Sequence, residues 1–319
     1  MPNLKTSWMK SAKRLNKVRR RVPRLDFLAR SIVEGYLTGL HRSPFHGYSA
    51  EFAEHKMYAP GEPIRFIDWK VYAKTGKFFI KKFDEETNMQ VQFILDASPS
   101  MYYPQVEPYD LDRLNKIGFS VVAVAALCEI LRRQRDAVGL SVFDEQLQLS
   151  TAAKTNTLHR QRILAELEKF WSRTPGRQGT ALARNLHLIA EQLRRRSVAV
   201  LFTDFWATGT TMDAWIESLK HLRYKTAELL FFHVSDAETE DLFRFPDRPL
   251  RFRDLETGQS LNLYPSEIRA HYVHRRREMQ QRLRDAAYRY DFDYYPVDVR
   301  TPFDEVLSAY LQKRLRMHG

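Results

Sequence analysis

The sequence predicts an α/β fold with a doubly wound, mostly parallel sheet, preceded by an N-terminal accessory segment. Short apolar runs, typical of buried strands, alternate with longer stretches in which apolar residues recur at helical spacing. The chain of 319 residues is 44% hydrophobic and 13% aromatic, which is enough for a large buried core. Strands that alternate with helices in this way imply a parallel sheet covered on both faces.

The expected elements follow one another along the second part of the chain. We expect strands at 91–95, 137–143, 146–150, 197–202, 227–234 and 292–299. We expect helices at 111–133, 157–171, 181–195, 212–222 and 266–290, with a last helix after Pro302. A hairpin at 250–263 turns at Thr257-Gly258. The chain therefore divides into a basic arm (1–24), an accessory segment (25–88) and an α/β domain (89–319) with an inserted hairpin (about 250–264).

The net charge of +12 belongs mainly to the N-terminal arm. Residues 1–24 hold nine lysines and arginines and no acidic residue, so the rest of the chain carries only +3. The arm contains a single aromatic residue, Trp8, whereas a nucleic-acid surface usually combines a basic face with several stacking aromatics. This distribution argues against nucleic acid as the main partner.

Composition also indicates where the protein works. No apolar run approaches the roughly 18 residues that a transmembrane helix requires, and the charged N-terminus does not resemble a secretory signal. The single cysteine, Cys128, excludes an intramolecular disulfide and a thiolate metal cluster. We therefore expect a cytoplasmic protein without a transmembrane segment.

Oxygen-bearing side chains follow two of the expected strands. The first strand leads into Asp96-Ala97-Ser98-Pro99-Ser100, and a later one leads into Asp204, while Thr180 lies between them after a glycine-containing loop. Alternate residues of an extended segment face the same way, and ligands bind beyond the carboxyl ends of parallel strands. Hydroxyls and carboxylates suit Mg²⁺ or Mn²⁺. The alternative is that these groups cap a strand-to-helix turn, and Thr180 and Asp204 taken singly are typical of capping residues.

This pattern resembles the metal-ion-dependent adhesion site of von Willebrand factor A domains, which have a Rossmann-type fold. The resemblance implies that Ser98, Ser100 and Thr180 lie near the metal, and that Asp96 and Asp204 bind it directly or through water. It also implies a protein partner that supplies an aspartate or glutamate to the metal, because neutral hydroxyls leave the cation's charge undercompensated.

A second resemblance lies upstream of the first strand. The segment that contains Tyr58, Gly61, Arg65, Asp68 and Trp69 resembles the signature of the domain-of-unknown-function family 58. Members of that family are often encoded beside MoxR-type AAA+ ATPases, which implies an assembly or chaperone-like role with such a partner. We expect the signature residues to have a structural role, in which Arg65 and Asp68 form an ion pair near the Trp69 ring.

These observations favour a metal-dependent interaction module over an enzyme. No histidine or lysine lies near Asp96 or Asp204 in the sequence to act as a base, and the chain has no Walker-type phosphate-binding loop. One alternative is a metal-dependent phosphoesterase with Asp96 as its nucleophile, although Ser98 stands where such enzymes usually have a second aspartate. Another is a nucleic-acid binder that acts through the basic arm.

Overall fold

The computed structural model describes residues 25–40, 55–57, 72–73, 75–81, 89–174, 181–206 and 211–318. The chain forms two compact units, one that joins residues up to Tyr36 with those from Met89 onward, and one that spans Leu37–Asn88. In the described part of the smaller unit, β1 (His55–Met57) and β2 (Phe79–Lys81) pair antiparallel. The larger unit contains the candidate site.

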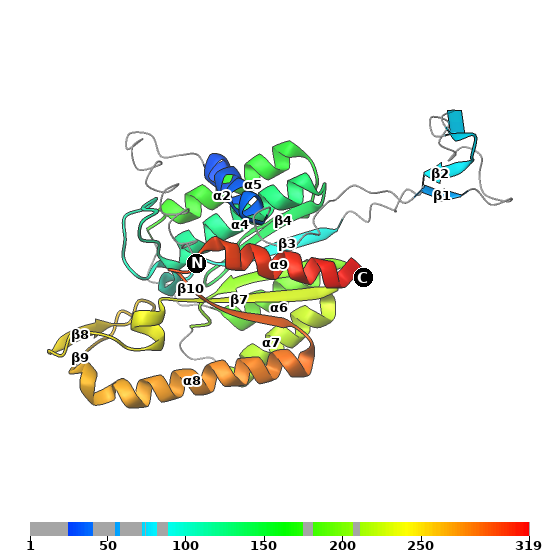
Figure 1. The fold of residues 1–319 in the computed structure, drawn as a ribbon. Coiled ribbons are helices and arrows are strands. Elements are labelled where there is room, and N and C mark those ends of the chain that lie inside the picture. Colours follow the sequence, from blue (N-terminus) through cyan, green and yellow to red (C-terminus); the bar gives the residue numbers. More distant parts are fainter. Residues whose placement is uncertain are drawn as a thin grey trace. The chain divides into compact units, whose positions relative to one another are not determined.

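A sheet of six strands forms the centre of the larger unit (Figure 1). In spatial order the strands are β10 (Asp293–Asp298), β7 (Glu228–Ser235), β6 (Ser197–Thr203), β3 (Gln90–Asp96), β4 (Ala137–Phe143) and β5 (Leu147–Ser150). All neighbours are parallel except β5, which runs antiparallel to β4. The order is that of a doubly wound sheet, in which the chain builds outward from a central strand first to one side and then to the other. The predicted fold class is confirmed.

Helices cover both faces of this sheet. They are α2 (Leu25–Leu40), α4 (Lys116–Arg133), α5 (Thr157–Ser172), α6 (Leu182–Gln192), α7 (Met212–Lys225), α8 (Pro265–Tyr290) and α9 (Phe303–His318). On one face α6, α7 and α8 pack on strand residues that include Ile94, Leu201 and Phe231 (Figure 1). On the other face α4 contacts α5 and α9, and the rings of Phe119 and Phe303 stack with centroids 5.0 Å apart. Both sheet faces are therefore buried, as the apolar strands require.

Two short helices and a hairpin complete the larger unit. The helices are η2 (Pro99–Tyr102), a 3₁₀ turn after β3, and η3 (Ala237–Asp241), a π-helical turn after β7. The hairpin consists of β8 (Leu250–Arg253) and β9 (Ser260–Leu263), and Gly258 has a φ of 75° at its turn, as glycine allows. Neither η2 nor η3 was predicted from the sequence, because so short a turn shows no periodicity.

The structure differs from the expected boundaries at the start of α4 and in the segment before the sheet. Helix α4 begins at Lys116 rather than at residue 111, because the Asn115 side chain caps it by accepting a hydrogen bond of 2.8 Å from the Gly118 amide. Residues 25–36 belong to the larger unit rather than to the accessory segment, since Asp26 pairs with Arg160 of α5 at 2.8 Å.

The described part of the chain contains helices of up to 26 residues. None of them combines the length and the apolar character that crossing a bilayer demands.

Candidate functional site

The candidate site lies at the carboxyl ends of β3 and β6, the two strands between which the winding of the sheet reverses. These strands are parallel neighbours, paired up to Leu95 and Phe202, so Asp96 and Asp204 emerge at the same edge of the sheet. Such a reversal point is where doubly wound proteins bind their ligands, because the connections leave in opposite directions and open a crevice.

The first part of the site is the turn from β3 into η2. The Ser98 amide donates a hydrogen bond of 2.9 Å to Asp96 Oδ1, and the hydroxyls of Ser98 and Ser100 lie 3.1 Å apart. Thr203 of β6 donates from its hydroxyl to Asp96 Oδ2 at 2.6 Å. The structure thus brings Asp96, Ser98 and Ser100 together, and all three are buried.

The environment of Asp96 opposes its ionisation. Burial raises the pKa of this carboxyl to about 7, and the charge of Asp204 acts in the same direction. The hydrogen bonds from Thr203 and Ser98 favour the ionised form but do not outweigh burial. A cation at this point would lower the pKa again, because it compensates the two negative charges.

Asp204 is held by a sharp turn at the end of β6. Phe205 has a φ of 54°, a left-handed conformation that is uncommon for a residue with a side chain. Its ring is buried against Trp215 at 4.6 Å and Phe231 at 5.3 Å between centroids, and this packing keeps the turn in place. The turn allows the Trp206 amide to donate to Asp204 Oδ1 at 3.1 Å.

Two further charged residues belong to the site, and sequence reasoning missed both. Lys116, the first residue of α4, is completely buried, and its Nζ donates to Asp204 Oδ2 at 2.7 Å. The same ammonium forms an ion pair with Glu240 of η3. Burial acts to lower the pKa of Lys116, but the charges of Asp204 and Glu240 outweigh it and raise the pKa. The lysine is therefore a fixed positive charge between two carboxylates.

A buried histidine lies behind this cluster. His233 of β7 contacts the carbonyl oxygen of Asp204 through Nε2 at 3.0 Å and the hydroxyl of Tyr294 through Nδ1 at 2.7 Å. Burial, together with the charge of Arg276, lowers the pKa of His233 well below its usual value, so the ring is neutral. Lys116 and His233 thus lie close to Asp204 in space, although no lysine or histidine lies near the two aspartates along the sequence.

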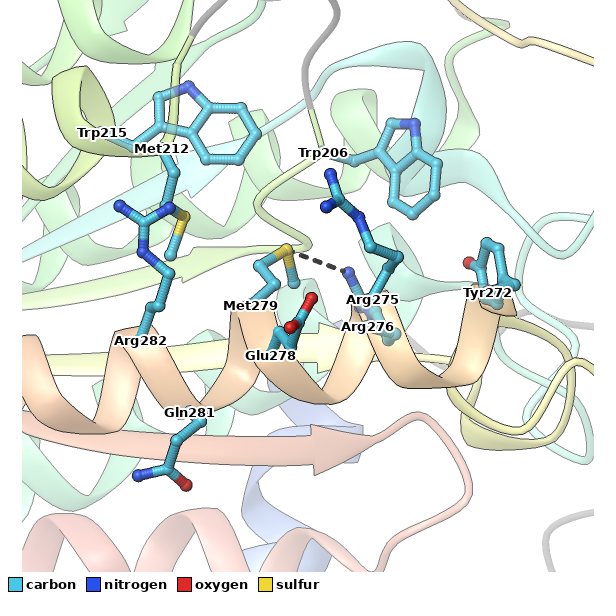
Figure 2. Close-up of a pocket in the computed structure, with 10 residues that line it drawn as sticks. All are labelled: Trp206, Met212, Trp215, Tyr272, Arg275, Arg276, Glu278, Met279, Gln281 and Arg282. Atoms are coloured by element: carbon cyan, nitrogen blue, oxygen red, sulfur yellow. Dashed lines mark hydrogen bonds between the residues drawn. The ribbon is translucent and has the colours of Figure 1, made fainter. Parts of the chain in front are cut away.

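A pocket of about 710 Å³ lies beside the cluster, between α7, α8 and the segment after β6. Figure 2 shows Met279 and Arg282 extending from α8 toward the chain that carries Trp206 and Trp215. Arg276, another residue that lines the pocket, is buried in its wall, where it lies 5.6 Å from the centre of the Trp206 ring. Arg276 connects the pocket wall to the site, because it also lies 3.2 Å from Nε2 of the histidine behind Asp204.

Several predicted residues lie outside the part of the chain that the structure describes. They are the candidate metal ligand Thr180, the signature residues Tyr58, Gly61, Arg65, Asp68 and Trp69, and the basic arm at 1–24. Their expected roles stay predictions.

The chemistry of the described donors fits a hard divalent cation. Two hydroxyls and two carboxylates converge at one edge of the sheet, and such oxygen ligands suit Mg²⁺ or Mn²⁺. Within the described residues, no three side chains of His, Cys, Asp or Glu come together as a metal-binding group. A cation here would therefore depend on the serine hydroxyls, and it would meet Lys116, which already binds Asp204.

Known proteins resemble this chain in sequence at a modest level. Uncharacterised proteins of Mycobacterium bovis and Mycobacterium tuberculosis are 23% identical to it over 234 residues, which is 73% of this chain and 69% of theirs.

Solved structures with similar folds have low sequence identity to it. BatB from Bacteroides thetaiotaomicron aligns with 72% of this chain and 99% of its own, at 15% identity and a TM-score of 0.42. PilB minor pilin from Streptococcus sanguinis aligns with 75% of this chain and 65% of its own, at 10% identity and a TM-score of 0.43. A von Willebrand factor type A protein from Catenulispora acidiphila aligns with 47% of this chain and 34% of its own, at 13% identity and a TM-score of 0.32. The strand order of the sheet and its antiparallel edge strand agree with the von Willebrand factor A-like fold that the sequence predicts.

A family profile covers more than half of the chain. The family described as "Protein of unknown function DUF58" matches residues 54–282. This range includes the upstream signature as well as Asp96, Ser98, Ser100 and Asp204. The chain therefore belongs to the DUF58 family.

Proposed function

We propose that this protein is an interaction module that holds a carboxylate side chain of a protein partner at the cluster formed by Asp96, Ser98, Ser100 and Asp204. The observation that supports it best is the convergence of these oxygen donors at the reversal point of the sheet. A Mg²⁺ or Mn²⁺ ion bound there would supply the positive charge that attracts the partner's carboxylate. Thr180 stays in the proposed ligand set on the strength of the family resemblance.

The protein's own residues would orient the ligands before a partner arrives. The hydroxyl of Thr203 and the Ser98 amide fix both oxygens of Asp96, and the Trp206 amide fixes one oxygen of Asp204. Preorganised donors of this kind reduce the ordering that binding requires. The site is therefore suited to recognition, in which the same contact forms and breaks repeatedly.

The residues near the site argue against the phosphoesterase alternative. Both oxygens of Asp96 accept hydrogen bonds from the protein, which lowers their nucleophilicity toward a phosphorus atom. Lys116 is held as an ammonium by two carboxylates, and His233 has partners on both ring nitrogens. We therefore propose binding rather than turnover, and hydrolysis of p-nitrophenyl phosphate that disappears in Asp96→Asn would contradict it.

We propose a MoxR-type AAA+ ATPase as the partner, since the family resemblance implies one, and the cytoplasm as the setting. The buried thiol of Cys128 suits a reducing compartment. Such an ATPase from the same organism is the protein to be used in the binding test.

The test measures the affinity of the whole chain for the purified ATPase, by biolayer interferometry with Mg²⁺ and then with EDTA. We expect binding in Mg²⁺ that EDTA abolishes and that the double variant Ser98→Ala/Ser100→Ala loses. Ser218→Ala is the matched control, because Ser218 is also buried and bonded through its hydroxyl, but in α7. Binding that withstands both EDTA and the double substitution would contradict the proposed site.

A further inference from the structure

We infer that Lys116 and Glu240 form an internal cation and carboxylate pair that occupies the candidate site when no partner is bound. This inference rests on the proposed function and concerns its regulation: the metal ion takes the place of the lysine's ammonium, and the partner's carboxylate takes the place of Glu240. The contacts of Lys116 with Asp204 and Glu240 then define the closed state of the site.

The position of Lys116 is unfavourable for a lysine unless its charge is used. It is the first residue of α4, and the amino end of a helix repels a cation. Its side chain is 0% exposed, and removing an ammonium from water is costly unless carboxylates compensate it. Asp204 and Glu240 provide that compensation. The lysine is therefore held in the site partly by Asp204, the same carboxylate that would bind a metal ion.

Glu240 is the outermost member of the cluster. Its side chain is 16% exposed, whereas those of Lys116 and Asp204 are 0% and 1% exposed. Its second oxygen accepts a hydrogen bond of 2.8 Å from the Asp236 amide at the start of η3. A carboxylate that approaches from solvent would reach the place where Glu240 now lies before it reached Asp204.

The short helix that carries Glu240 is fastened at both sides. The Tyr103 hydroxyl donates a hydrogen bond of 2.9 Å to the Thr239 hydroxyl, and Arg276 of α8 donates one of 2.9 Å to the Asp241 carboxylate. A π-helical turn is rare in proteins and is often found at functional sites. These anchors place Glu240 toward the lysine, so the internal carboxylate is built into the fold.

The bonds of the closed state leave few acceptors for a metal ion. Asp96 uses both oxygens within the protein, and Asp204 uses one for Trp206 and one for Lys116. A divalent ion bound to Asp204 would lie close to the ammonium, which is 2.7 Å from Oδ2, so charge repulsion favours displacement of the lysine from Asp204 and weakens its contact with Glu240. Metal and partner carboxylate should bind cooperatively, because each removes one half of the internal pair.

The test is a calorimetric titration of the whole chain with Mn²⁺ in the absence of partner, comparing wild type with Lys116→Met. We expect the variant to bind Mn²⁺ at least about tenfold more tightly, as the internal competitor has gone. Lys313→Met is the matched control: Lys313 also lies between two carboxylates, Glu228 at 2.7 Å and Asp293 at 2.9 Å, but these begin their strands at the opposite edge of the sheet. We expect this control to bind like wild type.

Thermal unfolding provides a second readout. In EDTA we expect Lys116→Met to melt at a lower temperature than wild type, since Asp204 and Glu240 have lost their shared cation, and Mn²⁺ should restore most of the loss. Mn²⁺ should not restore stability in Lys313→Met. If Lys116→Met does not fold in EDTA, Glu240→Gln replaces it in the titration, because this variant keeps the buried lysine and loses only the internal carboxylate. We expect Glu240→Gln to bind Mn²⁺ at least about threefold more tightly than wild type does.

The outcomes separate this inference from the proposed function. Equal Mn²⁺ affinity in wild type, Lys116→Met and Glu240→Gln would overturn the internal pair and leave the metal-dependent module standing. A Lys116→Met protein that binds no Mn²⁺ and gains no stability from it would overturn both.

Discussion

At the scale of single residues, Gly139 of β4 shows how closely the central sheet is packed where it pairs with Gln92 of β3. A Cβ atom there would collide with the side-chain oxygen of Gln92 and lie 2.7 Å from the carbonyl oxygen of Thr151. Gln92 has little freedom to withdraw, because its amide donates to the Ser141 hydroxyl at 2.9 Å. We expect Gly139→Ala to lower the free energy of unfolding by about 1–3 kcal/mol, measured by urea denaturation.

The control for this substitution is Gly35→Ala in α2, where an added Cβ meets nothing within 4 Å. Alanine is the better helix former, so this variant should gain about 0.5–1 kcal/mol. A Gly139→Ala protein as stable as Gly35→Ala would show that the sheet yields more readily than its packing indicates.

The residues of the site were predictable only where they follow strands directly. Asp96, Ser98 and Ser100 stand in one short segment, and Asp204 ends a second apolar run, so the pattern alone placed them at the same edge of the sheet. Lys116 lies 88 residues before Asp204, and Glu240 lies 124 residues after Lys116. Nothing in a single sequence signals a pairing across such separations, because it depends on how loops fold after the strands are in place.

At the scale of elements, an aromatic cluster fastens the hairpin to the body of the larger unit. Phe252 of β8 packs on Phe243 with ring centroids 5.4 Å apart, and Phe243 packs on Tyr272 of α8 at 4.5 Å. We expect Phe252→Ala to weaken the attachment by about 1–3 kcal/mol, so amide hydrogen exchange at 250–263 should accelerate while the central strands stay protected.

Leu261 supplies the control for the hairpin, since it lies on β9 with 63% of its surface exposed. Leu261→Ala should leave exchange in the hairpin unchanged. Equal acceleration in both variants would mean that the aromatic contact is not what holds the hairpin in place.

Elements were predictable in proportion to their length and periodicity. Helix α8 and strand β7 were expected within a residue or so of their bounds, because β7 is a short apolar run and α8 is a long charged stretch with no glycine and with proline only at its first position. The start of α4 was misplaced by five residues, since the capping side chain of Asn115 gives a weaker signal than the apolar residues before it. The turn η3 was missed altogether, because its acidic sequence indicates a loop.

At the scale of the whole molecule, the order of the strands explains why the candidate site lies at this edge of the sheet. The apolar strands predicted the doubly wound class, but they did not predict that β5 runs antiparallel to β4 at one edge. The central position of β3 and β6 determines which strand ends meet at the reversal point. The position of the candidate site therefore depends on the order of the strands as much as on the Asp-x-Ser-x-Ser motif.

The helices on the α4 face are joined by a network of charges. Glu129 of α4 is 1% exposed and accepts hydrogen bonds from Arg132 at 2.8 Å and Arg133 at 3.1 Å. Arg160 of α5 lies 3.7 Å from Glu129 and 2.8 Å from Asp26 of α2. The network therefore links three helices that are far apart in the sequence.

This network predicts a specific loss of stability in acid. Burial acts to raise the pKa of Glu129, but hydrogen bonds from Arg132 and Arg133 outweigh it, and the pKa lies below its usual value of 4.5. The unfolded chain then binds a proton at this carboxyl more readily than the folded chain does. The stabilisation by Glu129 is complete above pH 4.5 and is lost as the pH falls below that value.

We expect Glu129→Gln to lower the free energy of unfolding at pH 7 by about 1–3 kcal/mol, because bonds to a charged acceptor become bonds to a neutral one. The difference between variant and wild type should shrink as the pH is lowered from 5 to 3, since the wild type loses the same charge. Urea denaturation over this range measures the effect, with Glu217→Gln as control because the Glu217 pair with Lys220 is exposed. A difference that stays constant with pH would show that Glu129 contributes through packing rather than through its charge.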